Sequence, residues 1–257
     1  MSTLVLKIIA CVTMLIDHTA VTLWITGTLS GYYTLYRIMR GIGRIAFPIF
    51  CFQLVQGVKN TSDIKKYALR LLIFGIISEI PFDMALFAYK IVRTKEILYW
   101  GAQNVYFTLL LGLFCVYAIY RVSRLQGKAK LLGAVLTIAL TLACMVIAEK
   151  VILSDYGWGG VAMIAVMGLL TAPFEKIRFR LASEQFFQMF VSAFAIASCV
   201  LLTNSTEIFA LFALIPIYFY NGKQTVESRA ARKGFYIFYP AHLAILAAIF
   251  ILPYYFR

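Results

Sequence analysis

The stretch LVLKIIACVTMLIDHTAVTLWIT, residues 4–26, indicates the class of this protein more clearly than any other part of the sequence. Only Lys7, Asp17 and His18 add charged or imidazole groups to this apolar run. It is long enough to cross a hydrocarbon core, which takes about 20 residues of helix. It is also longer than the apolar core of a signal peptide, and no small-residue cleavage site follows it. We therefore expect a first membrane span that is retained.

The composition extends this expectation to the whole chain. Hydrophobic residues make up 62% of the sequence, mean hydropathy is +0.86 and charged residues make up 14%, whereas soluble domains hold about 25% charged residues. The loops are short, so residues 1–257 are predicted to form a single integral-membrane domain. The predicted fold class is all-α, a polytopic transmembrane helical bundle of about nine spans (range 8–10): 4–26, 42–58, 67–88, 104–121, 130–153, 156–172, 187–203, 206–220 and 235–254.

Lysine and arginine are distributed unevenly between alternate loops, and this asymmetry predicts the orientation. With the N-terminus in the cytoplasm, the cytoplasmic side holds 16 of the 24 basic residues: Lys7, four in 59–70, four in 121–130, three in 173–186 and four in 221–234. This is the positive-inside bias of multi-pass proteins, here of the cell membrane. Topology and contact with anionic membrane lipids thus explain the net charge of +13, and we expect no nucleic-acid partner.

The cysteines and histidines do not form a recognisable metal or disulfide pattern. All five cysteines lie inside predicted spans without C-x-x-C spacing: Cys11, Cys51, Cys115, Cys144 and Cys199. Buried free cysteine behaves as a small hydrophobe, so we predict neither a disulfide nor a zinc site. The two histidines lie in distant spans, so we expect no metal site.

Ionisable residues within the spans are candidates for function, because a charged group at membrane depth costs roughly 2.5 kcal/mol or more. In the predicted topology, polar residues of the first four spans fall into one outer slab of the membrane: Asp17, His18, Arg44, Glu79, Asp83, Gln103, Asn104 and Thr108. Buried polar groups need partners. We therefore expect these side chains to meet in one cavity.

Spacing predicts which of the charged residues share a helix face. Arg37, Arg40 and Arg44 are three and four residues apart, so they form one stripe if their helix begins before the span. Such a stripe suits a phosphate, a carboxylate or lipid headgroups, and interfacial anchoring is the alternative for Arg37 and Arg40. Glu79 and Asp83 also share a face, and they either pair with Arg44 or take part in catalysis.

The predicted topology places the two histidines at different depths. His18 lies in the outer half of the first span, where a neutral imidazole can take a proton near neutral pH; a helix–helix hydrogen bond is the alternative. His242, in the motif FYPAH at 238–242, is placed in the inner half of the last span. The two would then lie about 10 Å or more apart along the membrane normal. His242 would serve donor binding near the cytoplasmic face or contact Tyr239.

Several motifs resemble those of the TraX family over nearly the whole chain, least between residues 120 and 230. They are LKIIA at 6–10, MLIDH at 14–18, GRIAFPIF at 43–50, KKYALRLL at 65–72, SEIPFD at 78–83, QNVYFTL at 103–109 and FYPAHL at 238–243. The family is named for a conjugative-plasmid protein that acetylates the N-terminus of pilin. It is similar to a broader group of multi-span acyltransferases that take acetyl groups from acetyl-CoA.

The resemblance implies a membrane-bound acetyltransferase in which His18 is the catalytic residue and acetyl-CoA the acyl donor. His18 would act as general base while an amine or hydroxyl of the acceptor attacks the thioester. Arg44, with Gln103 or Asn104, would stabilise the oxyanion or hold donor phosphate. Glu79 and Asp83 would fix the arginine, and Asp17 would tune the histidine; pairing with an arginine is the alternative for Asp17.

The remaining predicted site residues would bind donor or substrate, and they are Arg37, Arg40, Thr108, Tyr239 and His242. The basic segment with Lys65, Lys66 and Arg70 is either topogenic or the place where CoA phosphates first bind. The acceptor is not identified, and a peptide, a glycan or a small molecule remain open.

Two other classes fit the same buried charges. A proton-coupled transporter or channel also uses intramembrane Asp, Glu, His and Arg. The odd number of predicted spans and the lack of an evident internal repeat argue slightly against a transporter. A non-catalytic assembly factor would tolerate neutral replacement of His18 and Arg44. Consumption of acetyl-CoA separates the enzyme from both.

Overall fold

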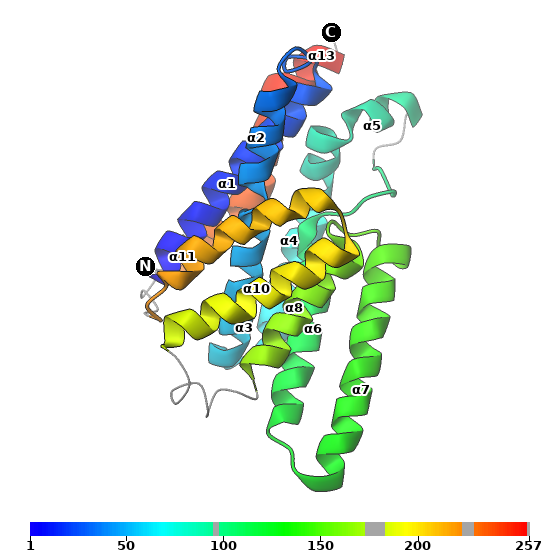
Figure 1. Ribbon diagram of the computed structural model, residues 1–257. Coiled ribbons are helices and arrows are strands. Elements are labelled where there is room, and N and C mark those ends of the chain that lie inside the picture. The colour runs from blue at the N-terminus through cyan, green and yellow to red at the C-terminus, as the bar shows by residue number, and fades with distance from the viewer. Residues whose placement is uncertain (95–97, 173–182, 223–228, 256–257) are drawn as a thin grey trace.

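The computed structural model of the protein describes residues 1–94, 98–172, 183–222 and 229–255 (Figure 1). Within these ranges the chain forms helices and no strand beyond one isolated bridge, between Gln103 and Ser154. The α-helices are α1 (Thr3–Ile25), α2 (Tyr33–Gly43), α3 (Ala46–Asn60), α4 (Ile64–Leu86), α5 (Ala88–Thr94), α6 (Val105–Ser123), α7 (Gly127–Val146), α8 (Gly157–Thr171), α10 (Glu184–Leu202), α11 (Leu214–Tyr218), α12 (Arg229–Leu246) and α13 (Leu252–Tyr255). The π-helices η1 (Ile147–Val151) and η4 (Ala247–Ile251) and the 3-10 helix η3 (Ser205–Ala213) continue neighbouring α-helices.

The predicted all-α, polytopic bundle is confirmed. Six helical segments of the described chain are long and apolar enough to cross a membrane: Thr3–Ile25, Tyr33–Asn60, Val105–Ser123, Gly127–Val151, Glu184–Leu202 and Lys233–Tyr255. Two shorter apolar segments, Gly157–Thr171 and Ser205–Tyr218, occupy the predicted spans 156–172 and 206–220. Helix α4 is 23 residues long but carries several charged residues. The second predicted span starts earlier than expected, at Tyr33, so the arginine stripe does lie on a helix.

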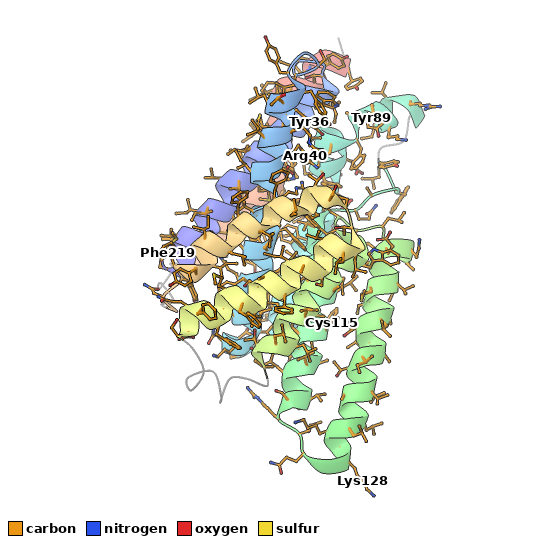
Figure 2. The ribbon with its side chains drawn as sticks, in the orientation of Figure 1. Tyr36, Arg40, Tyr89, Cys115, Lys128 and Phe219 are labelled. Atoms are coloured by element: carbon orange, nitrogen blue, oxygen red, sulfur yellow. The ribbon has the colours of Figure 1, made fainter. Side chains whose placement is uncertain are left out.

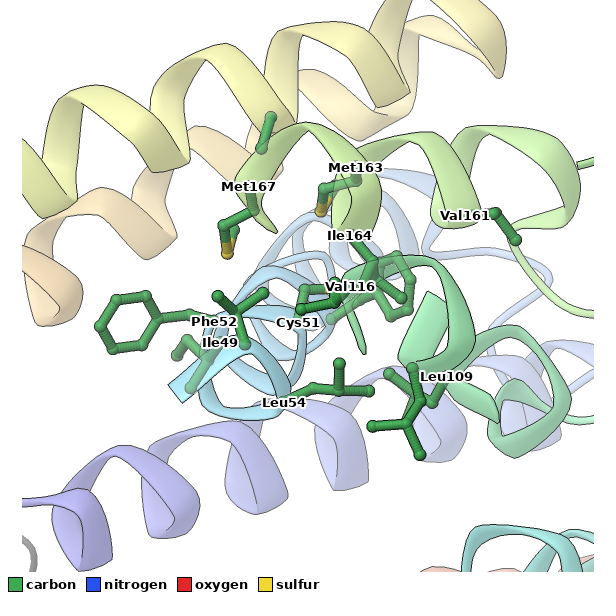
Figure 3. Close-up of a cluster of buried hydrophobic side chains, with 14 of the residues drawn as sticks. Ile49, Cys51, Phe52, Leu54, Leu109, Val116, Val161, Met163, Ile164 and Met167 are labelled. Atoms are coloured by element: carbon green, nitrogen blue, oxygen red, sulfur yellow. The ribbon is translucent and has the colours of Figure 1, made fainter. Parts of the chain in front are cut away.

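Helix α3 lies at the centre of the bundle and packs against α1, α6 and α8. Figure 3 shows the side chains that fill this region: Ile49, Cys51, Phe52 and Leu54 of α3, Leu109 and Val116 of α6, and Val161, Met163, Ile164 and Met167 of α8. Gly112 of α6 lets α8 approach closely, because a Cβ atom there would lie 2.4 Å from the Cδ1 atom of Ile164. This tight apolar core fixes the relative positions of the helices that carry the polar residues.

The outer face of α7 is apolar and exposed. Leu131 is 71% exposed, and Leu132, Leu136 and Ile138 each exceed 59%. A water-soluble domain does not leave an apolar surface of this extent uncovered, whereas lipid tails solvate it. Helix α7 is therefore a lipid-facing helix of the bundle.

Several helix ends lie on opposite sides of the molecule (Figure 1). In Figure 1 the α6–α7 turn and the C-terminal end of α3 lie on the lower side, and Figure 2 places Lys128 at that turn. The α1–α2 turn and α5 lie on the upper side, together with α13. The N-terminal amine contacts the Phe219 carbonyl group, so α1 begins beside the end of α11.

Candidate active site

The two histidines form a hydrogen-bonded pair in the interior. The Nδ1 atom of His18 lies 2.7 Å from the Nε2 atom of His242. The planes of the two rings are nearly parallel, with an interplanar angle of 3° and centroids 5.0 Å apart. His18 is 6% exposed and His242 is 5% exposed. The pair joins α1 to α12, which are helices from opposite ends of the sequence.

This contact corrects the predicted separation of the histidines. The expectation of different depths assumed that the last span begins near residue 235, whereas α12 begins at Arg229. His242 is therefore 13 residues from the start of its helix, and His18 is 15 residues from Thr3, the start of α1. The two helices run in the same direction, as their common upper end in Figure 1 shows. At the same rise per residue, the two rings reach the same level.

The hydrogen bonds of His242 decide the tautomers of both rings. Its Nδ1 atom lies 2.8 Å from the carbonyl oxygen of Phe238, which can only accept a hydrogen bond. His242 Nδ1 therefore donates, and the Nε2 atom of a neutral His242 ring accepts from His18 Nδ1. A neutral His18 then carries an unprotonated Nε2 atom, which receives no hydrogen bond from any residue the structure describes. The arrangement presents one imidazole nitrogen of a buried histidine as a proton acceptor.

The motif around His242 holds its ring in place. Pro240 lacks an N–H group and leaves the carbonyl oxygen of Tyr236 without its helical donor; the Tyr106 hydroxyl donates to it instead at 3.0 Å. The ring of Tyr239 meets the rings of His18 and His242 edge-on, with centroids 5.9 and 5.6 Å away. Tyr239 thus contacts the pair, and this contact is one of the two alternatives that the sequence left open for His242.

A second polar cluster lies on the neighbouring face of α1. Asp17 Oδ2 accepts from Arg40 Nη1 at 2.7 Å and from Arg44 Nη2 at 2.8 Å, and Arg44 Nη1 donates to Glu207 Oε1 at 2.8 Å. Arg44 and both carboxylates are buried. Gly43 makes the close contact between α1 and α2 possible, because a Cβ atom there would lie 2.2 Å from the Asp17 Cβ atom. We call Asp17, Arg40, Arg44 and Glu207 the arginine cluster.

Asp17, Arg40 and Arg44 lie together, as the predicted topology indicated, whereas Glu207 was not among the predicted site residues. The signal was present: Glu207 is the only carboxylate in the apolar segment 206–220. Glu207 lies on η3, which packs against α2 and α3, so a distant segment supplies the partner that was expected from α4.

Glu79 and Asp83 form a separate cluster and do not pair with Arg44. Glu79 Oε1 accepts from the backbone N–H of Asn104 at 2.8 Å and from its side-chain amide. Asp83 Oδ2 accepts from the backbone N–H of Tyr99 at 2.8 Å. The expected single cavity is therefore wrong: these carboxylates hold the segment that leads into α6, where Asn104 caps the helix.

Gln103 and Thr108 also fix backbone segments. The backbone N–H of Gln103 donates to Leu153 at 3.0 Å, and the Gln103 carbonyl accepts from the N–H of Asp155 at 2.7 Å. The Thr108 hydroxyl contacts the Ser154 hydroxyl, 2.9 Å away, and the Asp155 carbonyl. The amides of Gln103 and Asn104, which were expected to stabilise an oxyanion, are thus engaged elsewhere.

A pocket of about 270 Å³ opens beside the arginine cluster. Its lining comes from α2, the α2–α3 junction and the start of η3, and consists of Tyr36, Arg37, Arg40, Arg44, Asn204, Thr206 and Glu207. Figure 2 shows Tyr36 and Arg40 on α2 beside the η3–α11 segment. Arg37 lies at this pocket and forms no ion pair with a described residue.

Metal-binding groups do not gather in the described part of the chain. Among those residues, no group of three or more His, Cys, Asp or Glu side chains is placed to hold a metal ion. The five cysteines are buried free thiols.

These features define an integral membrane protein of helical bundle type with a histidine pair and an arginine–carboxylate cluster in its interior. The family model described as TraX protein matches residues 2–250, so the chain belongs to the TraX family, as its motifs indicated. "Probable fimbrial assembly protein FimC, serogroup H1" of Dichelobacter nodosus is 29% identical over 256 residues, which cover 95% of this chain and 93% of that protein. No solved structure matches the chain significantly.

Proposed function

We propose that the protein is an acetyl-CoA-dependent membrane acetyltransferase and that His18 is its general base. One observation carries the proposal: the hydrogen-bonded series Phe238 carbonyl, His242, His18 leaves His18 Nε2 unprotonated and available. A general base needs a positioned acceptor atom and a partner that holds its ring in one tautomer. Membership in the TraX family, and the similarity to a protein described as a probable fimbrial assembly protein, support a pilus-related acceptor.

The proposed step is a direct acyl transfer. The lone pair of the acceptor amine or hydroxyl attacks the thioester carbonyl carbon of acetyl-CoA, and His18 Nε2 takes the acceptor proton. The tetrahedral intermediate then collapses with cleavage of the carbon–sulfur bond. The leaving thiolate takes the proton back from His18, so the products are acetylated acceptor and CoA. The imidazolium that forms in between keeps its hydrogen bond to His242 Nε2, which stabilises the charge.

The role that we propose for the arginine cluster differs from the predicted one, which was to stabilise the oxyanion or hold donor phosphate. Both Nη atoms of Arg44 are used by Asp17 and Glu207, so Arg44 would position α1 against η3 rather than bind an oxyanion. Asp17 precedes His18 and would fix the rotation of α1 through Arg40 and Arg44. Asp17, Arg40 and Arg44 are therefore positioning residues in this proposal.

A transporter remains the second candidate, because the pocket beside a buried ion cluster also suits a substrate site. Purified protein in nanodiscs should release CoA from acetyl-CoA, slowly without acceptor and faster with it. The same protein in liposomes should take up no acetyl-CoA. CoA release without uptake supports the enzyme, and uptake of intact acetyl-CoA without release would overturn the proposal.

A further inference from the structure

The pocket beside the arginine cluster has a charge that its own residues do not neutralise. Asp17 pairs with both Arg40 and Arg44, and Glu207 pairs with Arg44. Arg37 lies about one turn before Arg40 on α2 and about two turns before Arg44, which caps the end of this helix, and it lines the same pocket. Asp155 is a further carboxylate near the cluster, and it interacts with Arg44 and Arg40 rather than with Arg37. Arg37 makes no ion pair with a described residue, so its cationic group is left at the pocket.

The buried atoms of the cluster also have unused hydrogen-bonding capacity. Arg44 Nε, Asp17 Oδ1 and Glu207 Oε2 are buried and have no hydrogen-bond partner in the described part of the structure. Arg44 is 8% exposed and Glu207 is 3% exposed, and both line the pocket. Buried polar groups are nearly always satisfied. An anion can accept from the arginines, and a hydroxyl or ammonium group on the same molecule can donate to Glu207.

We propose that this pocket binds an anionic group of the acceptor, a carboxylate or a phosphate, with Arg37 as the residue that recognises its charge. Calling the ligand the acceptor rests on the proposed acetyltransferase function. A pocket of about 270 Å³ suits one such group with its neighbouring atoms rather than a whole nucleotide. Arginine is the side chain best matched to carboxylate and phosphate, because its planar donors bind them in pairs.

The predicted topology separates this site from the donor. Helix α2 begins on the side where α1 ends, which the positive-inside bias places outside. Acetyl-CoA is made in the cytoplasm, so its phosphates would approach from the opposite side. An anion that enters the pocket from outside therefore belongs to the acceptor, whether soluble or lipid-linked.

Inorganic phosphate is a suitable probe, and Trp24 provides the signal. The Trp24 ring stacks on Tyr36, which lines the pocket, with centroids 4.5 Å apart. Protein in phosphatidylcholine nanodiscs would be titrated with phosphate at constant ionic strength, with chloride as the balancing anion. We expect a saturable fluorescence change that is absent in Trp24→Phe and whose dissociation constant rises about fivefold or more in Arg37→Gln. Arg37 is exposed and forms no ion pair with a residue that the structure describes, so we expect Arg37→Gln to keep its fold.

Arg93→Gln is the matched control, because it removes an exposed arginine of α5, elsewhere on the same side. A response equal in Arg37→Gln and wild type, or no saturable response in wild type, would overturn the proposal. Repeating the titration with phosphatidylglycerol in the nanodiscs identifies the source of the anion. A higher dissociation constant for phosphate indicates that the lipid headgroup competes for the pocket, whereas an unchanged dissociation constant indicates a soluble group. His18→Ala should still bind phosphate, so loss of turnover and loss of binding are distinguishable.

Discussion

His18 and His242, 224 residues apart in the sequence, lie with their Nδ1 and Nε2 atoms 2.7 Å apart in the interior of the bundle. Each ring has a separate task in the proposed chemistry. His242 is anchored by the Phe238 carbonyl and holds His18 in one tautomer, while His18 keeps its Nε2 atom for a proton from the acceptor. In this proposal His18 is the general base and His242 is the partner that orients it.

Replacing His242 should lower the rate without removing the base. His242→Leu takes away the acceptor for His18 Nδ1–H, and we expect kcat to fall about 100-fold with little change in KM for acetyl-CoA. His242→Gln offers an amide oxygen at the same place and should recover part of the loss. The midpoint of the pH–rate profile distinguishes a role in orienting the base from a merely structural role. It should shift in His242→Leu if His242 orients His18, whereas a merely structural role would leave it at the wild-type pH.

Arg44 should be essential for stability, because it is the buried cation between two buried carboxylates. Arg44→Met leaves Asp17 with Arg40 alone and Glu207 with no cation, and breaking such a pair costs about 3–5 kcal/mol. Thermal unfolding in detergent should show a large drop for this variant. The triple variant Asp17→Asn, Arg44→Met and Glu207→Gln removes the charges together and should be more stable than Arg44→Met. Equal stability of the two would contradict the described ion pairs.

Glu79 should act on structure more than on turnover. Glu79→Ala removes the acceptor for the Asn104 backbone and side chain, so we expect a loss of about 1–3 kcal/mol of unfolding free energy. Glu79→Gln keeps one acceptor oxygen and should lose less. CoA release per folded molecule should fall far less than in His18→Ala. A variant that is fully stable yet inactive would return Glu79 to the catalytic set.

The loop between η1 and α8 should give the stability a pH dependence. Burial raises the pKa of Asp155 to about 6, above the value of about 4 for an unfolded chain. Between these values the folded state holds the proton and the unfolded state does not, so stability falls as pH rises from about 4 to about 6. Asp155→Asn keeps the oxygen that accepts from the Tyr156 N–H. It should be more stable than wild type at pH 7, and a difference that is independent of pH would contradict this origin.

The sequence predicted the class of fold because membrane insertion constrains it strongly. Long apolar runs and alternating basic loops determine which segments are helices and on which side they begin. The arginine stripe followed from helix spacing alone. The start of α12 could not be predicted from the apolar pattern, because polar residues such as Arg229 and Arg232 extend the helix beyond its apolar part. This shift of one end was enough to misplace His242.

The partners within the membrane were less predictable than their depth. Two segments at the same level need not touch, and helix packing order decides which of them do. Arg44 therefore meets Glu207 of η3 rather than Glu79 of α4. The amides of Gln103 and Asn104 were assigned to catalysis, while the irregular segment before α6 needs them for its own backbone. The sequence marks Glu207 as an isolated carboxylate in an apolar segment, but it carries no signal for which helices pack together or for which backbone groups the two amides bind.

The rate of CoA release from acetyl-CoA by His18→Ala tests the central claim most directly. Wild type, His18→Ala and Thr19→Ala would be compared in nanodiscs, and Thr19 serves as control because it neighbours His18 on α1. We predict that release falls about 10²- to 10⁴-fold in His18→Ala and stays near the wild-type rate in Thr19→Ala. Folded His18→Ala that releases CoA as fast as wild type would contradict the account.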